Sequence, residues 1–175
     1  MNEELFRALV GWLETSPSAR DLDLHGDAHW RRVAWTAVDL GKEVRGSDPL
    51  VAFLFGLLHD SMRQGDGTDP EHGRRAEVVI GELNGRLFHL SEPRAELLST
   101  ACAGHADGLV SDDPTIGVCW DADRLDLWRL DMQPRAELLS SPAARSRDRI
   151  AWARGFTRER PTWDALLAKL PAAMP

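Results

Sequence analysis

The sequence predicts an all-α fold, a compact single-domain helical bundle, on three observations. A chain of 175 residues, 43% of them hydrophobic, can bury one substantial core and is short for two domains. Three Asp-Pro pairs, beginning at residues 48, 69 and 113, match an N-cap followed by proline at the first helical position. No run of alternating β-branched residues predicts a sheet. Residues 115–120 could pass for a strand, but an apolar stripe at helical spacing favours a helix there.

The expected helices span residues 2–14, 26–44, 49–62, 70–88, 92–105, 114–130, 143–154 and 162–170. Three of them begin at the Asp-Pro pairs, and the helix at 92 begins at Ser91-Glu92-Pro93. The segment 49–58 is apolar on every side, which places it in the centre of the domain. We expect the domain core to comprise residues 25–130, with C-terminal helices within 131–175 packed on it.

Charge and cysteine content exclude several classes of protein. The formal net charge of −7 argues against a partner that is nucleic acid or a membrane surface. The longest apolar run, residues 49–58, is too short to span a bilayer, and the acidic N-terminus is unlike a signal peptide. Cys102 and Cys119 form no Cys-x-x-Cys pair and are expected to be small buried hydrophobic residues. A cytoplasmic location is therefore expected, and a homo-oligomer stays open.

Five polar residues lie where the apolar stripes of separate helices face the core: His29, His59, His72, His105 and Asp123. His59 is followed directly by Asp60 at the end of the central apolar segment. A single histidine in such a position is most often a hydrogen-bonded core residue. An unpaired buried carboxylate is costly, however, and a nearby cation removes that cost. Several inward-facing imidazoles with two carboxylates are what a metal site needs.

Three short motifs in this order resemble the HD-domain superfamily of metal-dependent phosphohydrolases, and in particular its small stand-alone bacterial members. They are His29–Val33, which reads His-x-x-x-Val; Leu57–Asp60, which contains the His-Asp doublet; and Asp121–Asp126, which reads Asp-Ala-Asp-Arg-Leu-Asp. The resemblance covers about residues 25–130. It implies an all-α fold around one or two divalent ions (Mn²⁺, Fe²⁺, Ni²⁺, Co²⁺, Zn²⁺ or Mg²⁺). It also implies His29, His59, Asp60 and Asp123 as ligands.

The resemblance places His72 and His105 where dinuclear members hold a second metal, and the alternative is that these two histidines contact a substrate phosphate or position water. Asp121 and Asp123 point about 200° apart on a helix, so only one of them is expected to bind the ion. Asp123 is the expected ligand, because it lies on the apolar stripe and matches the position of the ligand in the family motif. Further residues expected to contact the substrate or to support a ligand are Arg63, Asp121, Arg124 and His25. Alternatively, Arg63 is a positive charge that the helix dipole favours at a helix C-terminus, and His25 is a residue at the start of a helix. Asp126, like Asp121, is expected to orient a ligand or to pair with an arginine.

The resemblance implies a metal-dependent hydrolase of a phosphoester or pyrophosphate, with a nucleotide as the substrate class. One alternative is a dinuclear-iron oxygenase, because the histidine and aspartate set permits that chemistry. Another is a non-catalytic protein that binds a nucleotide or a metal. Acidic residues that some members carry shortly after the doublet are missing here, where the chain reads Ser-Met-Arg-Gln. The stretch 145–160 holds six arginines, which form either a solvated helix face or a rim that attracts an anionic substrate.

Overall fold

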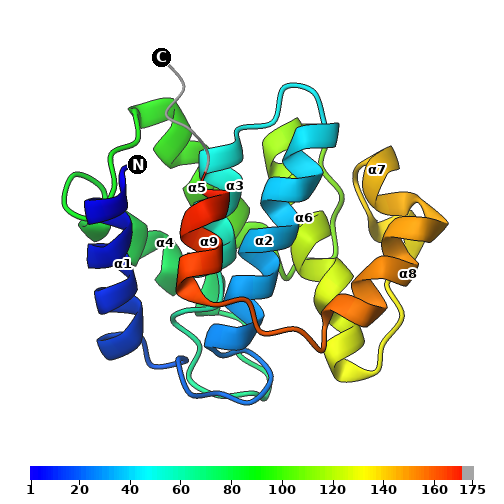
Figure 1. Ribbon diagram of the computed structural model, residues 1–175, viewed down its shortest axis with the longest axis horizontal. Coiled ribbons are helices and arrows are strands. Elements are labelled where there is room, and N and C mark those ends of the chain that lie inside the picture. Colours follow the sequence, from blue (N-terminus) through cyan, green and yellow to red (C-terminus); the bar gives the residue numbers. More distant parts are fainter. Residues whose placement is uncertain (171–175) are drawn as a thin grey trace.

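The computed structural model describes residues 1–170, which form nine α-helices and two short 3-10 helices and contain no β-strand. The helices are α1 (Glu3–Thr15), α2 (Asp27–Glu43), α3 (Pro49–Leu58), α4 (His72–Leu83), α5 (Glu92–Gly104), α6 (Pro114–Leu125), η1 (Asp126–Leu130), η2 (Ala136–Leu138), α7 (Pro142–Arg145), α8 (Arg147–Phe156) and α9 (Trp163–Lys169). The predicted all-α class is confirmed. Helix α1 lies at one end of the long axis and α7 and α8 at the other (Figure 1). The last five residues of the predicted C-terminal segment 131–175 lie outside the described residues.

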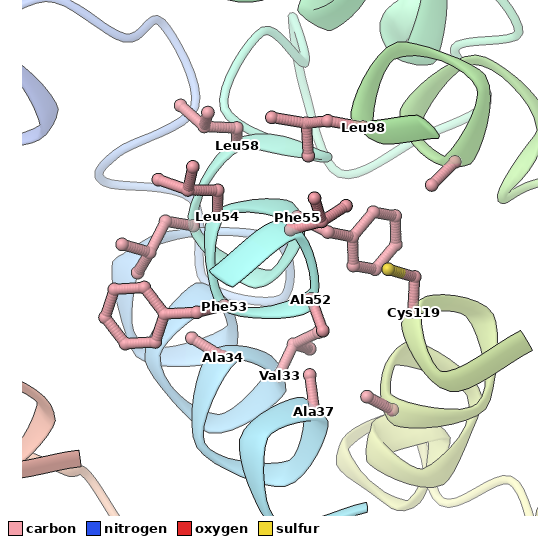
Figure 2. Packing of buried hydrophobic residues seen from close by; sticks show 14 of the residues in the cluster. Val33, Ala34, Ala37, Ala52, Phe53, Leu54, Phe55, Leu58, Leu98 and Cys119 are labelled. Carbon is pink, nitrogen blue, oxygen red and sulfur yellow. The ribbon is translucent and has the colours of Figure 1, made fainter. Parts of the chain in front are cut away.

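Helix α3 is the centre of the core, as its uniformly apolar sequence predicts. Its residues Leu50–Leu58 are all buried. Figure 2 shows α3 with side chains of α2, α5 and α6 around it, among them Ala34, Leu98 and Cys119. Both cysteines are free and fully buried in this core. In residues 1–170 no helix is both long and apolar enough to cross a membrane.

Two of the three predicted Asp-Pro caps are confirmed. The carboxylate of Asp48 accepts hydrogen bonds from the amides of Leu50 and Val51, and Asp113 does the same for the first turn of α6. The prediction for Asp69 is wrong, because α4 begins at His72. The Asp69 carboxylate instead binds the amide of Gln64 and the guanidinium of Arg75.

Several predicted helices end earlier than expected, because local hydrogen bonds compete with the helix. Helix α3 ends at Leu58 rather than at 62, since Ser61 turns back onto the Leu58 carbonyl through both its amide and its hydroxyl. Helix α4 ends at Leu83 rather than at 88, because the amide group of Asn84 pairs with the backbone of Leu90 and Gly85 has a φ of 87°.

The last two boundary differences lie on the C-terminal side. The predicted helix 114–130 tightens after Leu125 into η1, which ends where Asp131 takes a left-handed φ of 56°. The predicted helix 143–154 is two helices, α7 and α8. Ser141 and Ser146 each cap one of them with a side-chain hydroxyl, and an extended backbone at Ser146 separates the two.

Asp48 both caps helix α3 and forms an ion pair with Arg94. The free energy of unfolding is therefore expected to depend on pH. Its carboxylate also accepts two hydrogen bonds from Arg94, 2.6 and 2.8 Å long. Partial burial opposes ionisation, but Arg94 and the helix amides lower the pKa of Asp48. Asp48→Ala is expected to reduce the free energy of unfolding by about 1–2 kcal/mol in urea at pH 7. Asp48→Asn keeps a side chain that caps the helix well. Its smaller loss of unfolding free energy therefore measures the contribution of the charge alone.

The folded-state pKa of Asp48 lies below the unfolded value of about 3.9. The charge therefore stabilises the fold fully above pH ~4, and this contribution is lost as the pH falls through the folded pKa. The difference in unfolding free energy between wild type and Asp48→Asn should shrink below pH ~4. A difference that stays constant down to pH 2.5 would contradict this assignment.

Candidate metal centre

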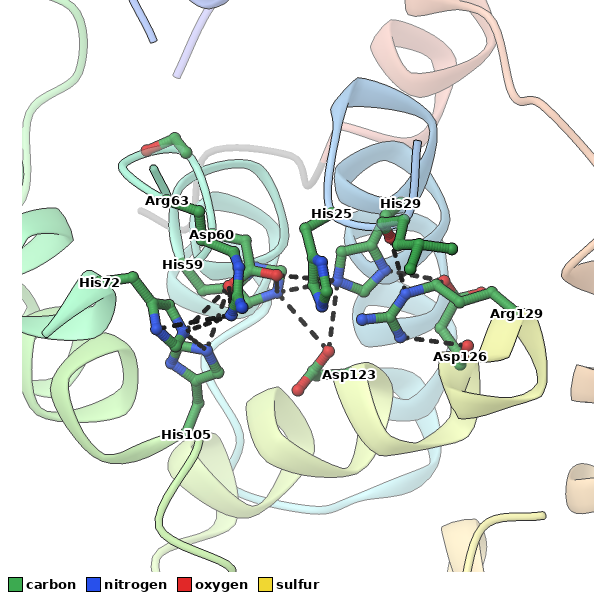
Figure 3. A network of polar contacts seen from close by, with 12 residues as sticks. His25, His29, His59, Asp60, Arg63, His72, His105, Asp123, Asp126 and Arg129 are labelled. Atoms are coloured by element: carbon green, nitrogen blue, oxygen red, sulfur yellow. Dashed lines mark hydrogen bonds and ion pairs between the residues drawn. The ribbon is translucent and has the colours of Figure 1, made fainter. Parts of the chain in front are cut away.

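Six acidic and imidazole side chains from five helices meet at one end of the bundle (Figure 3). They are His29 from the first turn of α2, His59 and Asp60 directly after α3, His72 from the start of α4, His105 directly after α5, and Asp123 from α6. All are buried except Asp123, whose side chain is 17% exposed. The four predicted ligands are therefore brought together with the two histidines predicted to hold a second metal or to contact a phosphate, and Asp123 is the most exposed of the six.

Each of the four histidines is anchored through its Nδ1 atom. The partners are the Asp126 carboxylate for His29, at 2.7 Å, and backbone carbonyls for the other three, at Phe55, Asp69 and Cys102. An acceptor at Nδ1 fixes the proton on that nitrogen. All four rings therefore present Nε2 to the interior of the cluster, which is the usual arrangement of metal-binding histidines.

The Nε2 atoms converge in two pairs around the carboxylate of Asp60. Those of His29 and His59 are 3.1 Å apart, and those of His72 and His105 are 2.8 Å apart. Oδ2 of Asp60 lies 3.5 and 3.7 Å from the first pair, and Oδ1 lies 3.1 and 3.4 Å from the second. Oδ1 of Asp123 lies 3.3 and 3.6 Å from the first pair. Asp60 thus stands between two groups of ligand atoms.

Four of these eight distances, 3.1 to 3.4 Å, fall in the range expected for two ligands of one divalent ion, and the other four are 2.8 Å and 3.5 to 3.7 Å. Two ligands bound at ~2.1 Å with angles between 90° and 110° are about 3.0–3.4 Å apart. Two groups of three residues each offer one ligand atom per residue within 4.8 Å of one another. The first group is His29, His59 and Asp123, and the second is His59, Asp60 and His105. Oδ1 of Asp60 is fully buried and makes no hydrogen bond. A buried carboxylate oxygen without a hydrogen bond, next to imidazole nitrogens, is what a cation would satisfy.

The protonation states are those of a site that favours cations. Burial and the charge of Arg129 oppose protonation of His29, but contacts with Asp123, Asp126 and Asp60 raise its pKa to about 9. Burial lowers the pKa of His59. Nε2 of His29 faces Nε2 of His59 and the carboxylates of Asp60 and Asp123.

The two aspartates of the cluster are ionised at neutral pH. Burial opposes ionisation of Asp60, but the imidazoles of His59, His105, His29 and His72 hold its pKa well below its usual range. Burial likewise opposes ionisation of Asp123, and His29 and His59 lower its pKa well below the usual range.

Asp126 and Arg32 fix the orientation of the His29 ring. Asp126 accepts the Nδ1 hydrogen bond of His29 and two further bonds from Arg32, 2.8 and 2.9 Å long. Asp126 therefore both orients His29 and pairs with an arginine. Arg32 was not singled out from the sequence, although it lies three residues after His29 on the same face of the helix.

Two of the predicted site residues point elsewhere. Asp121 accepts hydrogen bonds from the amides of Ser140 and Ser141 and from the Ser141 hydroxyl, and so fixes the start of α7. Arg124 donates to the carbonyl of Leu138 and lies over the ring of Trp120. The structure does not bring either to the cluster, because their hydrogen-bond partners lie between residues 138 and 141, in η2 and before α7.

The other two lie beside the cluster. The ring of His25 is 6.2 Å from that of His29 and its Nδ1 is 2.8 Å from Asp66. It precedes α2 rather than belonging to it. Nη1 of Arg63 is 3.3 Å from Nε2 of His72 and 3.7 Å from Oδ1 of Asp60. The rest of the Arg63 guanidinium donates to the carbonyls of Gly65 and Gly67.

Comparison of the chain with protein-family models, with curated proteins and with solved structures finds no match.

Proposed function

We propose that this chain is a divalent-metal-dependent hydrolase of the HD type that acts on a phosphoester or pyrophosphate, with a nucleotide as the substrate class. The observation that carries the metal site is the convergence of four anchored imidazoles on Asp60, with Asp123 at the solvent side. The reaction class rests on the resemblance of the three sequence motifs to HD-domain phosphohydrolases.

The ligand set supports one ion at His29, His59, Asp60 and Asp123, and a second at His72, His105 and the other oxygen of Asp60. A divalent ion in such a centre neutralises charge on phosphoryl oxygens and lowers the pKa of a bound water. Asp126, which is bound by Arg32, keeps the His29 ring oriented toward the cluster. Arg63, kept beside His72 by the loop carbonyls, would donate to a phosphoryl oxygen. Asp123 and His25, with side chains 17% and 12% exposed, face the side from which a substrate would enter.

Two aspartates of α6 offer a matched test of this assignment. Asp123→Asn should lose bound metal and metal-dependent phosphate release. Asp121→Asn, two residues away, should keep both and lose about 1–3 kcal/mol of stability, because it binds Ser140 and Ser141 rather than the cluster. Metal content by mass spectrometry and phosphate release with Mn²⁺ or Co²⁺ from phosphomonoesters, nucleotides and pyrophosphate-linked nucleotides measure both effects. Absence of metal-dependent release from every substrate, or equal metal loss in the two variants, would refute the proposal.

A dinuclear-iron oxygenase is the second candidate, favoured by the position of Asp60 between two groups of imidazoles. The discriminating measurement is metal identity and spin. About two irons per chain, an electron paramagnetic resonance signal on partial oxidation and no phosphate release would favour the oxygenase. Full hydrolytic activity with a redox-inert ion such as Zn²⁺ or Mg²⁺ would favour the hydrolase.

A further inference from the structure

A cavity of about 500 Å³ lies beside the metal centre and is lined by five arginines. The loop before α2, α2 itself, η1 and the end of α8 contribute to its walls. The arginines are Arg32, Arg129, Arg154, Arg158 and Arg160, against two acidic residues, Asp23 and Asp131. Its volume is that of a small-molecule site.

Two of the arginines form a fixed, buried part of this cavity. The side chains of Arg32 and Arg129 are each 8% exposed. Arg32 is bound to Asp126 through Nε and Nη2, and Arg129 donates to the carbonyls of Leu24 and Asp126 through Nε and Nη1. Within residues 1–170 the remaining nitrogens, Nη1 of Arg32 and Nη2 of Arg129, make no hydrogen bond. Figure 3 shows Arg129 beside Asp126.

The other three arginines are exposed and come from α8 and the segment after it. In the described part of the chain, no carboxylate lies within ion-pair distance of Arg154, Arg158 or Arg160, whereas Arg149 of the same helix pairs with Glu43. Arg154 lies over the ring of Trp128, 5.1 Å from its centroid, which keeps its guanidinium at the cavity wall. Half of the arginine-rich stretch seen in the sequence therefore gathers at one cavity.

We propose that this cavity binds the phosphate group of a small molecule, as a site additional to the metal centre. Planar guanidinium groups match phosphate oxygens with paired hydrogen bonds. The chain carries a net charge of −7, so the cavity is a local concentration of positive charge on an acidic protein. That contrast favours a compact anion over a nucleic acid, which would extend beyond the cavity over a protein of net negative charge. The phosphate group belongs either to a free inorganic anion or to a nucleotide.

Metal-free protein comprising residues 1–175 tests the site without reference to hydrolysis. Isothermal titration calorimetry with pyrophosphate should show one site per chain. Arg158→Gln combined with Arg160→Gln should weaken its binding at least tenfold, because two charge-assisted contacts are lost. The matched control is Arg74→Gln combined with Arg86→Gln, two exposed arginines of α4 and the turn after it, which remove the same charge and should leave affinity within twofold.

Titration with inorganic phosphate and with a nucleoside triphosphate separates the two sources of the phosphate group. Tighter binding of the nucleoside triphosphate than of pyrophosphate assigns the site to a nucleotide, and equal or weaker binding assigns it to a free anion. No binding of pyrophosphate at several millimolar, or equal weakening in the two double variants, overturns the proposal. Either failure would leave the metal content and phosphate release of the neighbouring centre unaffected, so it would not bear on the hydrolase proposal.

Discussion

Asp60→Ala is expected to remove both metal binding and metal-dependent activity, because among residues 1–170 only Asp60 has carboxylate oxygens that face both groups of histidines. The variant takes away the central negative charge and leaves four imidazoles facing each other. The loss of activity should exceed the about 10- to 100-fold effect that is typical when a residue behind a ligand is changed. Metal content and phosphate release at saturating Mn²⁺ measure the effect.

Asp126→Asn supplies the graded comparison for that variant. It keeps every ligand and weakens only the support of His29 and the pairing with Arg32. Metal affinity or activity should therefore fall by about 10- to 100-fold rather than disappear. If Asp60→Ala retained wild-type metal content, the central position of Asp60 would have no functional meaning. Equal effects of the two variants would assign Asp60 a supporting role only.

Gly56→Ala is expected to have the largest effect on stability. A Cβ built on Gly56 would lie 2.3 Å from the backbone N and Cα of Ala34, where α2 crosses α3. Backbone atoms cannot rotate away, so the two central helices must separate. We expect a loss of about 3 kcal/mol or more in unfolding free energy, at the upper end of the range for overpacked cores. Chemical denaturation monitored by tryptophan fluorescence measures it.

Gly11→Ala is the matched control, since Gly11 lies within α1 and a Cβ there meets no atom within 4 Å. It should stabilise the protein by up to about 1 kcal/mol through helix propensity alone. A destabilisation of similar size at both positions would contradict the close crossing of α2 and α3. Because His59 and Asp60 directly follow α3, the Gly56 variant should also reduce metal content at temperatures where it remains folded.

The helical class and the inward direction of the ligands could be predicted from the sequence, because both depend on local periodicity. His29 and Asp123 lie on apolar stripes, and a stripe is a property of a few consecutive turns. The opposite directions of Asp121 and Asp123 follow from the same geometry. Asp48 shows that a cap is also readable, since its partners are two and three residues away.

Other features depend on contacts between distant segments and could not be predicted. Asp69 has the sequence of a cap, but the nearby Arg75 and the amide of Gln64 compete for its carboxylate. Asp121 finds its partners about twenty residues away in an irregular segment. The same limit applies to the arginine-lined cavity, because Arg32 and Arg158 line it together only after the segment that follows α8 has returned to α2, where Arg31 donates to the carbonyl of Pro161.

Metal content tests the central claim, that these side chains bind divalent ions, most directly. Protein purified with neither added metal nor chelator should contain one or two transition-metal ions per chain by mass spectrometry. Anomalous scattering from its crystals should place them between the Nε2 atoms of the four histidines and the carboxylate of Asp60. Protein that carries no metal, and that binds none after dialysis against Mn²⁺, Fe²⁺, Co²⁺, Ni²⁺ or Zn²⁺, would contradict the account.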